Sequence, residues 1–261
     1  MKIMQTHSSL YWKKYFTRNA SVKRIDWQLK PQLTKFEKSK IIKSLQAWQL
    51  GETSEGEHLL QAAKKYALKT NDNEYPDAVK LFIKEEQKHG NNLGKYLDLI
   101  DEPRITEDWG DTMFRKIRYY NTNMELWTIA VITVESAAQI FYQALKDASN
   151  CTLLKQICTD ILIDEAAHIT FQKERLYIIF SGKNSISKFI AYHAYTCFFI
   201  CTSLVIWFAH QKLFKAGRLN FFKYFQKMMR KLDKVAGTAV LYHTENKTSS
   251  VYDSSKIVQS I

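Results

Sequence analysis

The sequence predicts an all-α protein whose centre is a four-helix bundle. Only three prolines and eight glycines occur in 261 residues, so little in the chain interrupts a helix. Apolar residues recur three or four positions apart over most of the chain, which is the spacing of one helix face. The 46% apolar content suffices for one substantial core with appendages.

We expect four regions along the chain. They are an N-terminal helical segment packed on the bundle (1–37), the bundle itself (38–182), a hydrophobic helix followed by a basic amphipathic helix (183–235) and a disordered tail rich in Ser, Thr and Lys (236–261). The N-terminal helix is predicted by apolar residues between Leu10 and Phe16.

Two bundle helices are predicted in the first half of the chain. An apolar stripe from Ile41 to Tyr66 predicts one helix of about 30 residues that ends near Thr70, and Glu52 and Glu55 lie on this stripe. The polar segment 71–76 predicts a turn, and its proline, at position 76, suits the first turn of the next helix. That second helix extends past residue 93.

The other two bundle helices follow a long connection. Residues 101–111 contain Pro103 and Gly110 and form the longest irregular stretch, as in a bundle with one crossover. Apolar periodicity then predicts helices over 123–148 and 152–180, and the segment 181–184 breaks the pattern.

The segment 189–209 contains no Lys, Arg, Asp or Glu and is long enough to span a bilayer. The segment 212–234 follows, with eight Lys or Arg against one acid. If the segment 189–209 spanned a membrane, the bundle and the basic segment would lie on opposite sides of it, although both flanks of the span carry positive charge. We therefore favour a fifth helix packed on the bundle over a helix that dips into one leaflet with the basic segment on the lipid surface.

Charge and cysteine usage narrow the functional classes. The net charge of +12 is spread along the chain without a zinc-finger spacing or an Arg-rich arm, so we do not expect a nucleic-acid partner. The four cysteines lie at helical spacings in apolar stretches and are expected to be reduced thiols. The first 20 residues lack a continuous apolar run, so we expect a cytoplasmic protein, with a peripheral or monotopic position at the inner membrane face as the alternative.

The most informative motif is Glu-x-x-His, which occurs twice, 79 residues apart, each time directly after another acid. The copies are Glu85, Glu86 and His89, and Asp164, Glu165 and His168. Residues three positions apart leave a helix on one side, so each Glu and His can hold one ion together. Each copy also has a glutamate upstream, Glu55 at 31 residues before Glu86 and Glu135 at 30 before Glu165.

Four glutamates and two histidines inside a bundle require positive charge among them. An unpaired buried carboxylate costs several kcal/mol. Two divalent cations balance four carboxylates, and neutral imidazoles add nitrogen ligands. Mixed oxygen and nitrogen ligation suits iron or manganese better than zinc.

These residues resemble the ferritin-like di-iron carboxylate superfamily, over about residues 38–180. The resemblance implies a ferritin-like four-helix bundle, two iron ions with manganese as an alternative at either position, and the ligands Glu55, Glu86, His89, Glu135, Glu165 and His168. It also implies that Glu85 and Asp164 each hold the histidine of the opposite helix and fix its tautomer. Glu52 is the alternative or additional ligand of the first helix, and the matched spacing of 31 and 30 favours Glu55.

The same resemblance implies an oxidoreductase that activates dioxygen to oxidise an organic small molecule or lipid, with an external electron donor and a possible homodimer. The alternative is an iron-handling protein with ferroxidase or storage activity and no organic substrate. The stripe of His193, Cys197 and Cys201 is interpreted as a packed seam rather than a metal site, and Tyr142 as a core residue.

Overall fold

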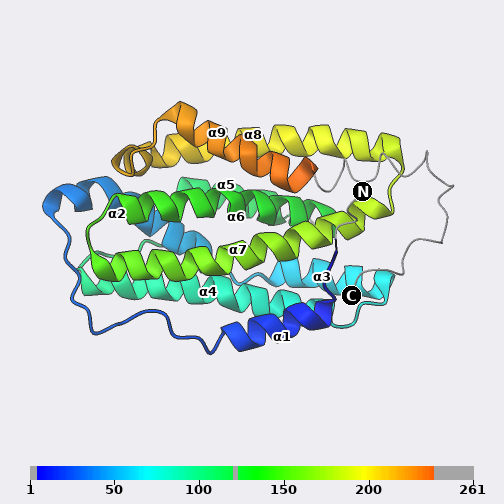
Figure 1. Ribbon diagram of the computed structural model, residues 1–261, viewed down its shortest axis with the longest axis horizontal. Coiled ribbons are helices and arrows are strands. Elements are labelled where there is room, and N and C mark those ends of the chain that lie inside the picture. Colours follow the sequence, from blue (N-terminus) through cyan, green and yellow to red (C-terminus); the bar gives the residue numbers. More distant parts are fainter. Residues whose placement is uncertain (1–4, 120–122, 238–261) are drawn as a thin grey trace, which may run out of the picture.

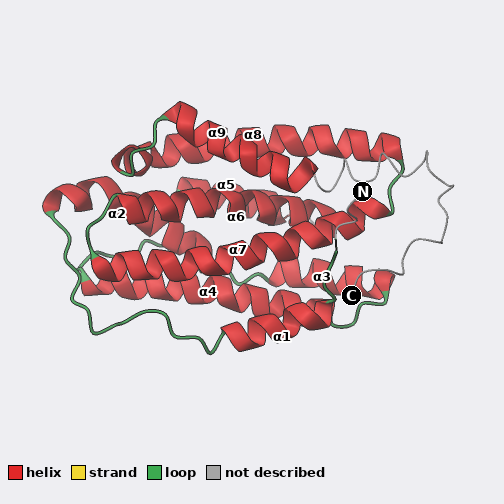
Figure 2. Cartoon of the chain, viewed as in Figure 1, coloured by secondary structure: helices red, strands yellow, loops and turns green. Residues whose placement is uncertain are grey.

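The computed structural model describes residues 5–119 and 123–237, and every regular element within them is helical, which confirms the predicted all-α class (Figure 2). The elements are α1 (Ser9–Asn19), α2 (Lys35–Glu52), α3 (Glu57–Thr70), α4 (Tyr75–Leu99), α5 (Trp109–Tyr119), α6 (Met124–Asp147), α7 (Thr152–Ser181), α8 (Ser185–Ala216), α9 (Phe221–Leu232) and the π-helical turn η1 (Asp233–Gly237).

The helices α2, α4, α6 and α7 lie side by side and form the bundle (Figure 1). The helix α3 continues the chain after α2 and packs on α4 and α6. On one side of the bundle, at the top of Figure 1, α8 and α9 form an additional layer on α2 and α6; on the opposite side, α1 runs along α4. The bundle interior is therefore covered from two sides.

Local signals mark the starts of several helices. Thr34 and Glu37 form a capping box that begins α2, with the Thr34 hydroxyl accepting from the backbone N–H of Glu37. Pro76 lies in the first turn of α4, as predicted. Asparagine side chains cap α6, α8 and α9 by accepting backbone N–H groups.

The first predicted helix is two helices in the structure. Residues 53–56 separate α2 from α3, and Gly56 there has a φ of 67°, a left-handed conformation that favours glycine. A Cβ at Gly56 would lie 2.8 Å from the side chain of Ile83 on α4, so the break is also fixed by a close approach. Periodicity could not reveal this break, because the apolar stripe continues across it.

Three further differences concern the connections and the C-terminal part. The crossover after α4 contains a helix, α5, that the sequence did not predict. The hydrophobic helix α8 is longer than 189–209 and has a kink at His210 (φ −119°, ψ 16°). Residues 238–261, most of the segment predicted to be disordered, lie outside the described residues.

The N-terminal segment is attached by aromatic packing and by one buried acid. Trp12 and Phe16 on α1 pack against Phe82 of α4 and Phe171 of α7 in one apolar cluster. The Trp12 Nε1–H donates to the buried Glu174 at 2.8 Å. A second, larger cluster fills the bundle and the contact with α8 and α9.

Two of the described helices are long and apolar enough to cross a membrane by length and composition, α6 and α8. In α6 the most apolar window is 67% buried, as expected for a bundle helix, whereas in α8 it is only 28% buried. Composition alone therefore does not distinguish these two helices, but their burial does.

Candidate metal centre

Four carboxylates and two imidazoles meet inside the bundle. They are Glu52 from α2, Glu86 and His89 from α4, Glu135 from α6, and Glu165 and His168 from α7. They form two overlapping groups, and in each group one ligand atom per residue lies within 4.8 Å of the others. Glu86 and Glu165 belong to both groups, so these two carboxylates lie between the two positions where a cation could bind.

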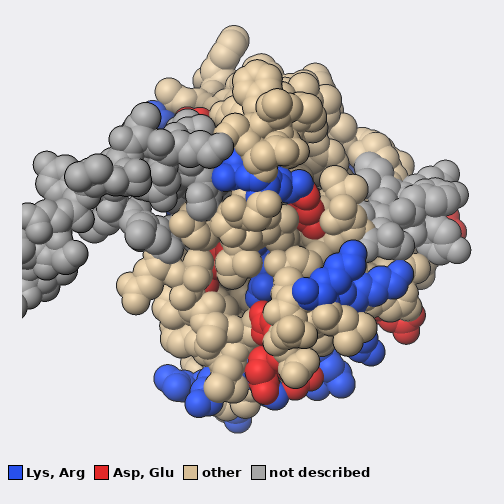
Figure 3. Space-filling model, turned by 90° about the vertical axis from the view of Figure 1, so that its right-hand side faces the viewer, with Lys and Arg blue, Asp and Glu red and all other residues tan. Residues whose placement is uncertain are grey.

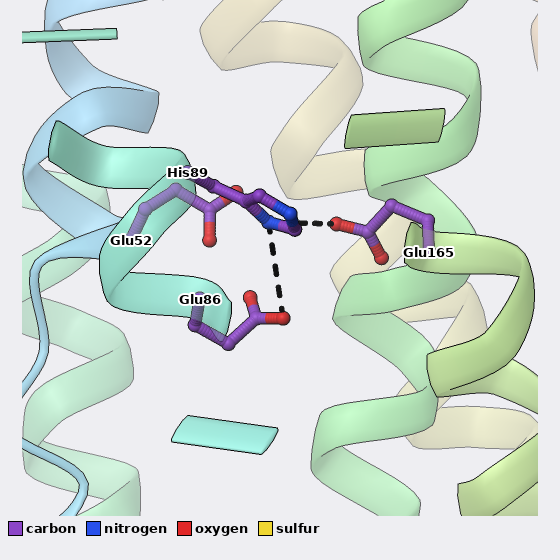
Figure 4. A group of neighbouring side chains, drawn as sticks. All are labelled: Glu52, Glu86, His89 and Glu165. Atoms are coloured by element: carbon purple, nitrogen blue, oxygen red, sulfur yellow. Dashed lines mark ion pairs between the residues drawn. The ribbon is translucent and has the colours of Figure 1, made fainter. Parts of the chain in front are cut away.

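Both histidines turn Nδ1 toward the carboxylates. His89 Nδ1 lies 4.0 Å from Glu86 Oε1 and 3.9 Å from Glu165 Oε1 (Figure 4). His168 Nδ1 lies 2.7 Å from Glu86 Oε1 and 3.8 Å from Glu135 Oε2. Each Nδ1 is thus placed beside one group of acids, and both are fully buried.

The other ring nitrogens contact the acids that precede the motifs. His89 Nε2 lies 3.1 Å from Asp164 Oδ2, and His168 Nε2 lies 2.8 Å from Glu85 Oε2. The acid on α7 therefore holds the histidine on α4, and the acid on α4 holds the histidine on α7. With the proton on Nε2 facing a carboxylate, Nδ1 keeps a lone pair toward the centre.

Residues of the N-terminal segment contact the two acids that hold the histidines. Asn19 Nδ2 donates both to Glu85 at 2.6 Å and to Asp164 at 2.8 Å, and Arg24 Nη1 donates to Asp164 at 3.0 Å. Lys88 Nζ donates to the other Asp164 oxygen at 2.7 Å. Burial alone would raise the pKa of Asp164, but the hydrogen bond and charge of His89, together with Lys88 and Asn19, hold that pKa well below its ordinary range.

On the first helix, the geometry corrects the preference for Glu55. The helix α2 ends at Glu52, whose buried side chain lies in the first group. Glu55 lies in the loop after it, is exposed, and is in neither group. The matched spacing of 31 and 30 residues misled because it assumed an unbroken helix through residues 53–56.

Glu52 also has two hydrogen-bond donors that the other central carboxylates lack. The Tyr142 hydroxyl of α6 donates to Glu52 Oε1 at 2.6 Å, and the Trp48 Nε1–H of α2 donates to the same oxygen at 2.9 Å. Burial, and then the negative charge of Glu52, raise the pKa of Tyr142 well above its ordinary value. Tyr142 is therefore a neutral donor, and it orients Glu52 in addition to filling the core.

The residues present fit a pair of cations. Glu165 makes no hydrogen bond through either oxygen, and Glu86 Oε1 and Nδ1 of both histidines also have no hydrogen-bond partner of acceptable geometry among the described residues. All these atoms face one another. Burial, followed by the charge of a neighbouring glutamate, raises the pKa of both Glu52 and Glu165 well above the ordinary value. Cations among these atoms would satisfy the unpaired lone pairs and remove this repulsion.

A pocket adjoins the centre on the side of α5 and α8. Its cavity volume is about 210 Å³, and its wall includes all four central glutamates. Most of the remaining lining is apolar or aromatic and comes from several helices: Trp48, Phe82, Phe114, Trp127, Phe198 and Ile206. A molecule in this pocket would contact the carboxylates at one end and apolar side chains elsewhere.

Sequence reasoning missed the contributions of Asn19, Arg24 and Trp48 to the site. The contacts of Asn19 and Arg24 with Asp164 join residues 145 and 140 positions apart, and no local pattern predicts them. Trp48 could have been found, since it precedes Glu52 by one helical turn. His193, Cys197 and Cys201 are all exposed, and none belongs to the two candidate metal groups found in residues 5–119 and 123–237.

Comparison with solved structures identifies the fold. No protein-family model and no curated protein matches the sequence. Two forms of an R2-like ligand-binding oxidase, with an anaerobically and an aerobically reconstituted Mn/Fe cofactor, match with TM-scores of 0.61 and 0.63 at 15% identity. Each match covers 89% of this chain. It covers 93% of the first oxidase chain and 94% of the second. The chain has the ferritin-like fold. The predicted fold class is thereby confirmed over most of the chain.

Proposed function

We propose that this protein is an oxidase with a dinuclear iron or manganese–iron centre, which uses dioxygen to oxidise an apolar organic molecule. The observation that carries the proposal is the pair of buried Nδ1 atoms without hydrogen bonds that face four glutamates, three of them buried and Glu86 half-buried. The shared fold and the Mn/Fe cofactor of the R2-like ligand-binding oxidases support the choice of metals.

Six residues would hold the two ions. One ion would be bound by Glu52 and His89, the other by Glu135 and His168, with Glu86 and Glu165 between them. Such ions supply one-electron redox chemistry and the activation of dioxygen.

The surrounding residues of this chain keep the ligands in place. Asp164 and Glu85 retain the Nε2 protons of the histidines, which leaves each Nδ1 free to act as a ligand. Trp48 and Tyr142 occupy one oxygen of Glu52, so they turn the other oxygen toward the centre.

The pocket supports an apolar organic substrate or a lipid. Its aromatic and aliphatic walls would exclude water and place the substrate beside the glutamates. We also include an external electron donor in the proposal, as expected from the sequence. A cytoplasmic location and a homodimer remain predictions from the sequence.

The direct test is metal content after anaerobic reconstitution. Mass spectrometry should find about two iron, or one manganese and one iron, per chain, and admission of air should consume dioxygen. Fewer than about one metal ion per chain would contradict the proposal. A double substitution of His89→Ala and His168→Ala, with helical content checked by circular dichroism, should abolish both signals.

Iron handling without an organic substrate is the alternative, and the same preparation distinguishes it. A ferroxidase or storage protein would continue to oxidise added ferrous iron far beyond two equivalents and would retain the product. For an oxidase, we expect oxidation to stop near two equivalents, because the pocket beside the centre has a volume of only about 210 Å³ and mostly apolar walls, which leaves no room for an iron mineral.

A further inference from the structure

The helix α8 is apolar all round, but only one of its faces is covered. Tyr195, Phe199 and Ile206 are buried against the body, whereas Ile186, Phe189 and Phe208 are 73%, 64% and 64% exposed. The same face includes Ile190, which is 62% exposed, the exposed side chains of His193, Cys197 and Cys201, and the half-buried Leu204. At 3.6 residues per turn, the stripe from Ile186 to Phe208 covers an arc of about 120° and a length of about 33 Å.

This stripe is uncharged and lies beside cationic groups. No Lys, Arg, Asp or Glu occurs from residue 189 to residue 211. Beyond the stripe, five basic side chains are exposed on the end of α8 and on α9: Lys212, Lys215, Lys223, Lys227 and Arg230. In residues 185–237 the only acid is Asp233, against nine Lys or Arg. In Figure 3, the upper part of the molecule, on the side of α8, is mostly tan, and most charged atoms lie lower.

The helix α8 lies along the bundle and is tied to it at several points. The Tyr224 hydroxyl of α9 donates to the Ser203 carbonyl at 3.0 Å, and His210 Nδ1 lies 3.1 Å from the Ser44 hydroxyl of α2. Crossing a bilayer would require these contacts and the buried face to separate from the body. The outer face can instead meet an apolar surface while α8 stays in place.

Charge decides between two occupants of this face. A second copy of the chain would bring two positively charged α8–α9 layers together, so the cations at the ends of the stripes would repel. An anionic bilayer surface offers acyl chains for the stripe and negative headgroups for the basic side chains. We propose that the outer face of α8, with the exposed basic residues of α9, docks on the surface of an anionic lipid bilayer without crossing it.

Docking would also place the pocket near the lipid. Phe198, Val205 and Ala209 of α8 line the pocket that adjoins the metal centre. A single helix would then separate the acyl chains from the pocket, which suits a lipid-soluble substrate. This consequence rests on the proposed function, whereas the docking itself does not.

Vesicle sedimentation tests the docking with the full chain. The protein should sediment with vesicles of phosphatidylcholine that contain about one third phosphatidylglycerol, should bind phosphatidylcholine alone at least tenfold more weakly, and should be released by roughly 0.5 M salt. The variant Ile190→Glu should bind at least tenfold more weakly, because it places a charge in the apolar stripe. A second variant, Lys223→Glu with Lys227→Glu, should lose the preference for anionic vesicles.

Matched controls are available on other exposed apolar residues. Phe36→Glu on α2 and Leu68→Glu on α3 also introduce a charge at an exposed apolar position but lie outside α8, so both should bind like the unmodified protein. Failure to bind anionic vesicles at low salt would overturn the proposal. So would a dimer in sedimentation velocity that Ile190→Glu dissociates, since a second copy would then cover the stripe. Metal content, measured on the same samples, keeps these outcomes separate from the proposed function.

Discussion

Each histidine of the centre divides its two ring nitrogens between different partners. Nε2 contacts an acid on the facing helix, and Nδ1 faces the carboxylates, so this acid favours a proton on Nε2 and leaves Nδ1 as the nitrogen that would bind an ion. Asn19 contacts both of these acids and thereby links the N-terminal segment to both histidines. The ligands are therefore positioned by residues that are themselves buried and paired.

Glu52 and Glu55 provide a matched pair that tests the ligand set. Glu52→Gln should weaken metal binding by about 10- to 100-fold, because it removes a charged ligand of one position. Glu55→Gln should leave binding unchanged, since Glu55 is exposed in the loop. Competition with a chromogenic chelator measures both affinities. Loss of metal from the Glu55 variant alone would show that the loop rearranges to supply the ligand.

The approach of α4 to the end of α2 depends on Gly90. A Cβ there would lie 2.8 Å from Thr53 Cγ2 and 3.1 Å from the Glu52 carbonyl carbon. Gly90 follows His89 directly, so this contact sets how closely two helices that carry proposed ligands approach. Gly51, one residue before Glu52, has no atom within 4 Å of such a Cβ.

Alanine at these two glycines should have opposite effects. Gly90→Ala should destabilise the fold by about 1–3 kcal/mol, because the new methyl group overpacks the contact, and it should also weaken metal binding. Gly51→Ala should stabilise α2 by about 0.5–1 kcal/mol. Urea unfolding of the metal-free proteins measures the first effect. If both substitutions changed the free energy of unfolding equally, helix propensity rather than the close approach of α4 to α2 would determine the effect at Gly90.

His210 lies at the kink of α8, in edge-on contact with the stacked rings of Trp48 and Phe141. Burial lowers the pKa of His210 from 6.5 to about 4, with the charge of Asp108 acting in the opposite direction. The neutral imidazole is therefore the form compatible with the folded chain, while the unfolded chain binds a proton below pH 6.5.

Stability should consequently decrease as the pH falls from about 6.5 toward 4. At pH 5 the loss from His210 alone should be up to about 2 kcal/mol relative to pH 7.5, and stability above pH 6.5 should not depend on this group. Urea unfolding of the unmodified protein and of His210→Gln, compared at pH 7.5 and pH 5, isolates the contribution. If the difference between the two proteins does not change with pH, the imidazole is not titrating in this range.

For the molecule as a whole, bound metal should act as a major source of stability. Four glutamates inside the bundle repel one another without cations, and an ion that binds only the folded chain adds about 4 kcal/mol when its free concentration is 1,000 times Kd. Stripping the metal with a chelator should lower Tm by roughly 10 °C. The His89→Ala and His168→Ala double variant should show almost no change under the same treatment, and an equal decrease there would point to a chelator effect unrelated to the centre.

The helices and the two motifs could be predicted because their signals are local. Periodicity within one helix identified α4, α6 and α7, and the i, i+3 spacing placed each Glu beside its His. The choice of Glu52 over Glu55 could not be predicted, since it depends on a break in the helix at residues 53–56, where Gly56 has a left-handed φ and approaches Ile83 on another helix. The roles of Asn19 and Tyr142 likewise arise only when distant segments pack together.

The acid of α4 contacts the histidine of α7 and the acid of α7 contacts the histidine of α4, and this reciprocal arrangement has a consequence for metal selectivity. Viewed from either helix, the centre offers a similar set: an acid, a glutamate that belongs to both groups, and a histidine held from across the bundle. This internal symmetry cannot by itself distinguish one ion from another. A preference can originate where this symmetry is broken. Trp48 and Tyr142 engage one oxygen of Glu52, and Lys88 and Arg24 donate hydrogen bonds to Asp164. We therefore expect the residues that break the symmetry, at Glu52 and around Asp164, to determine any preference between iron and manganese.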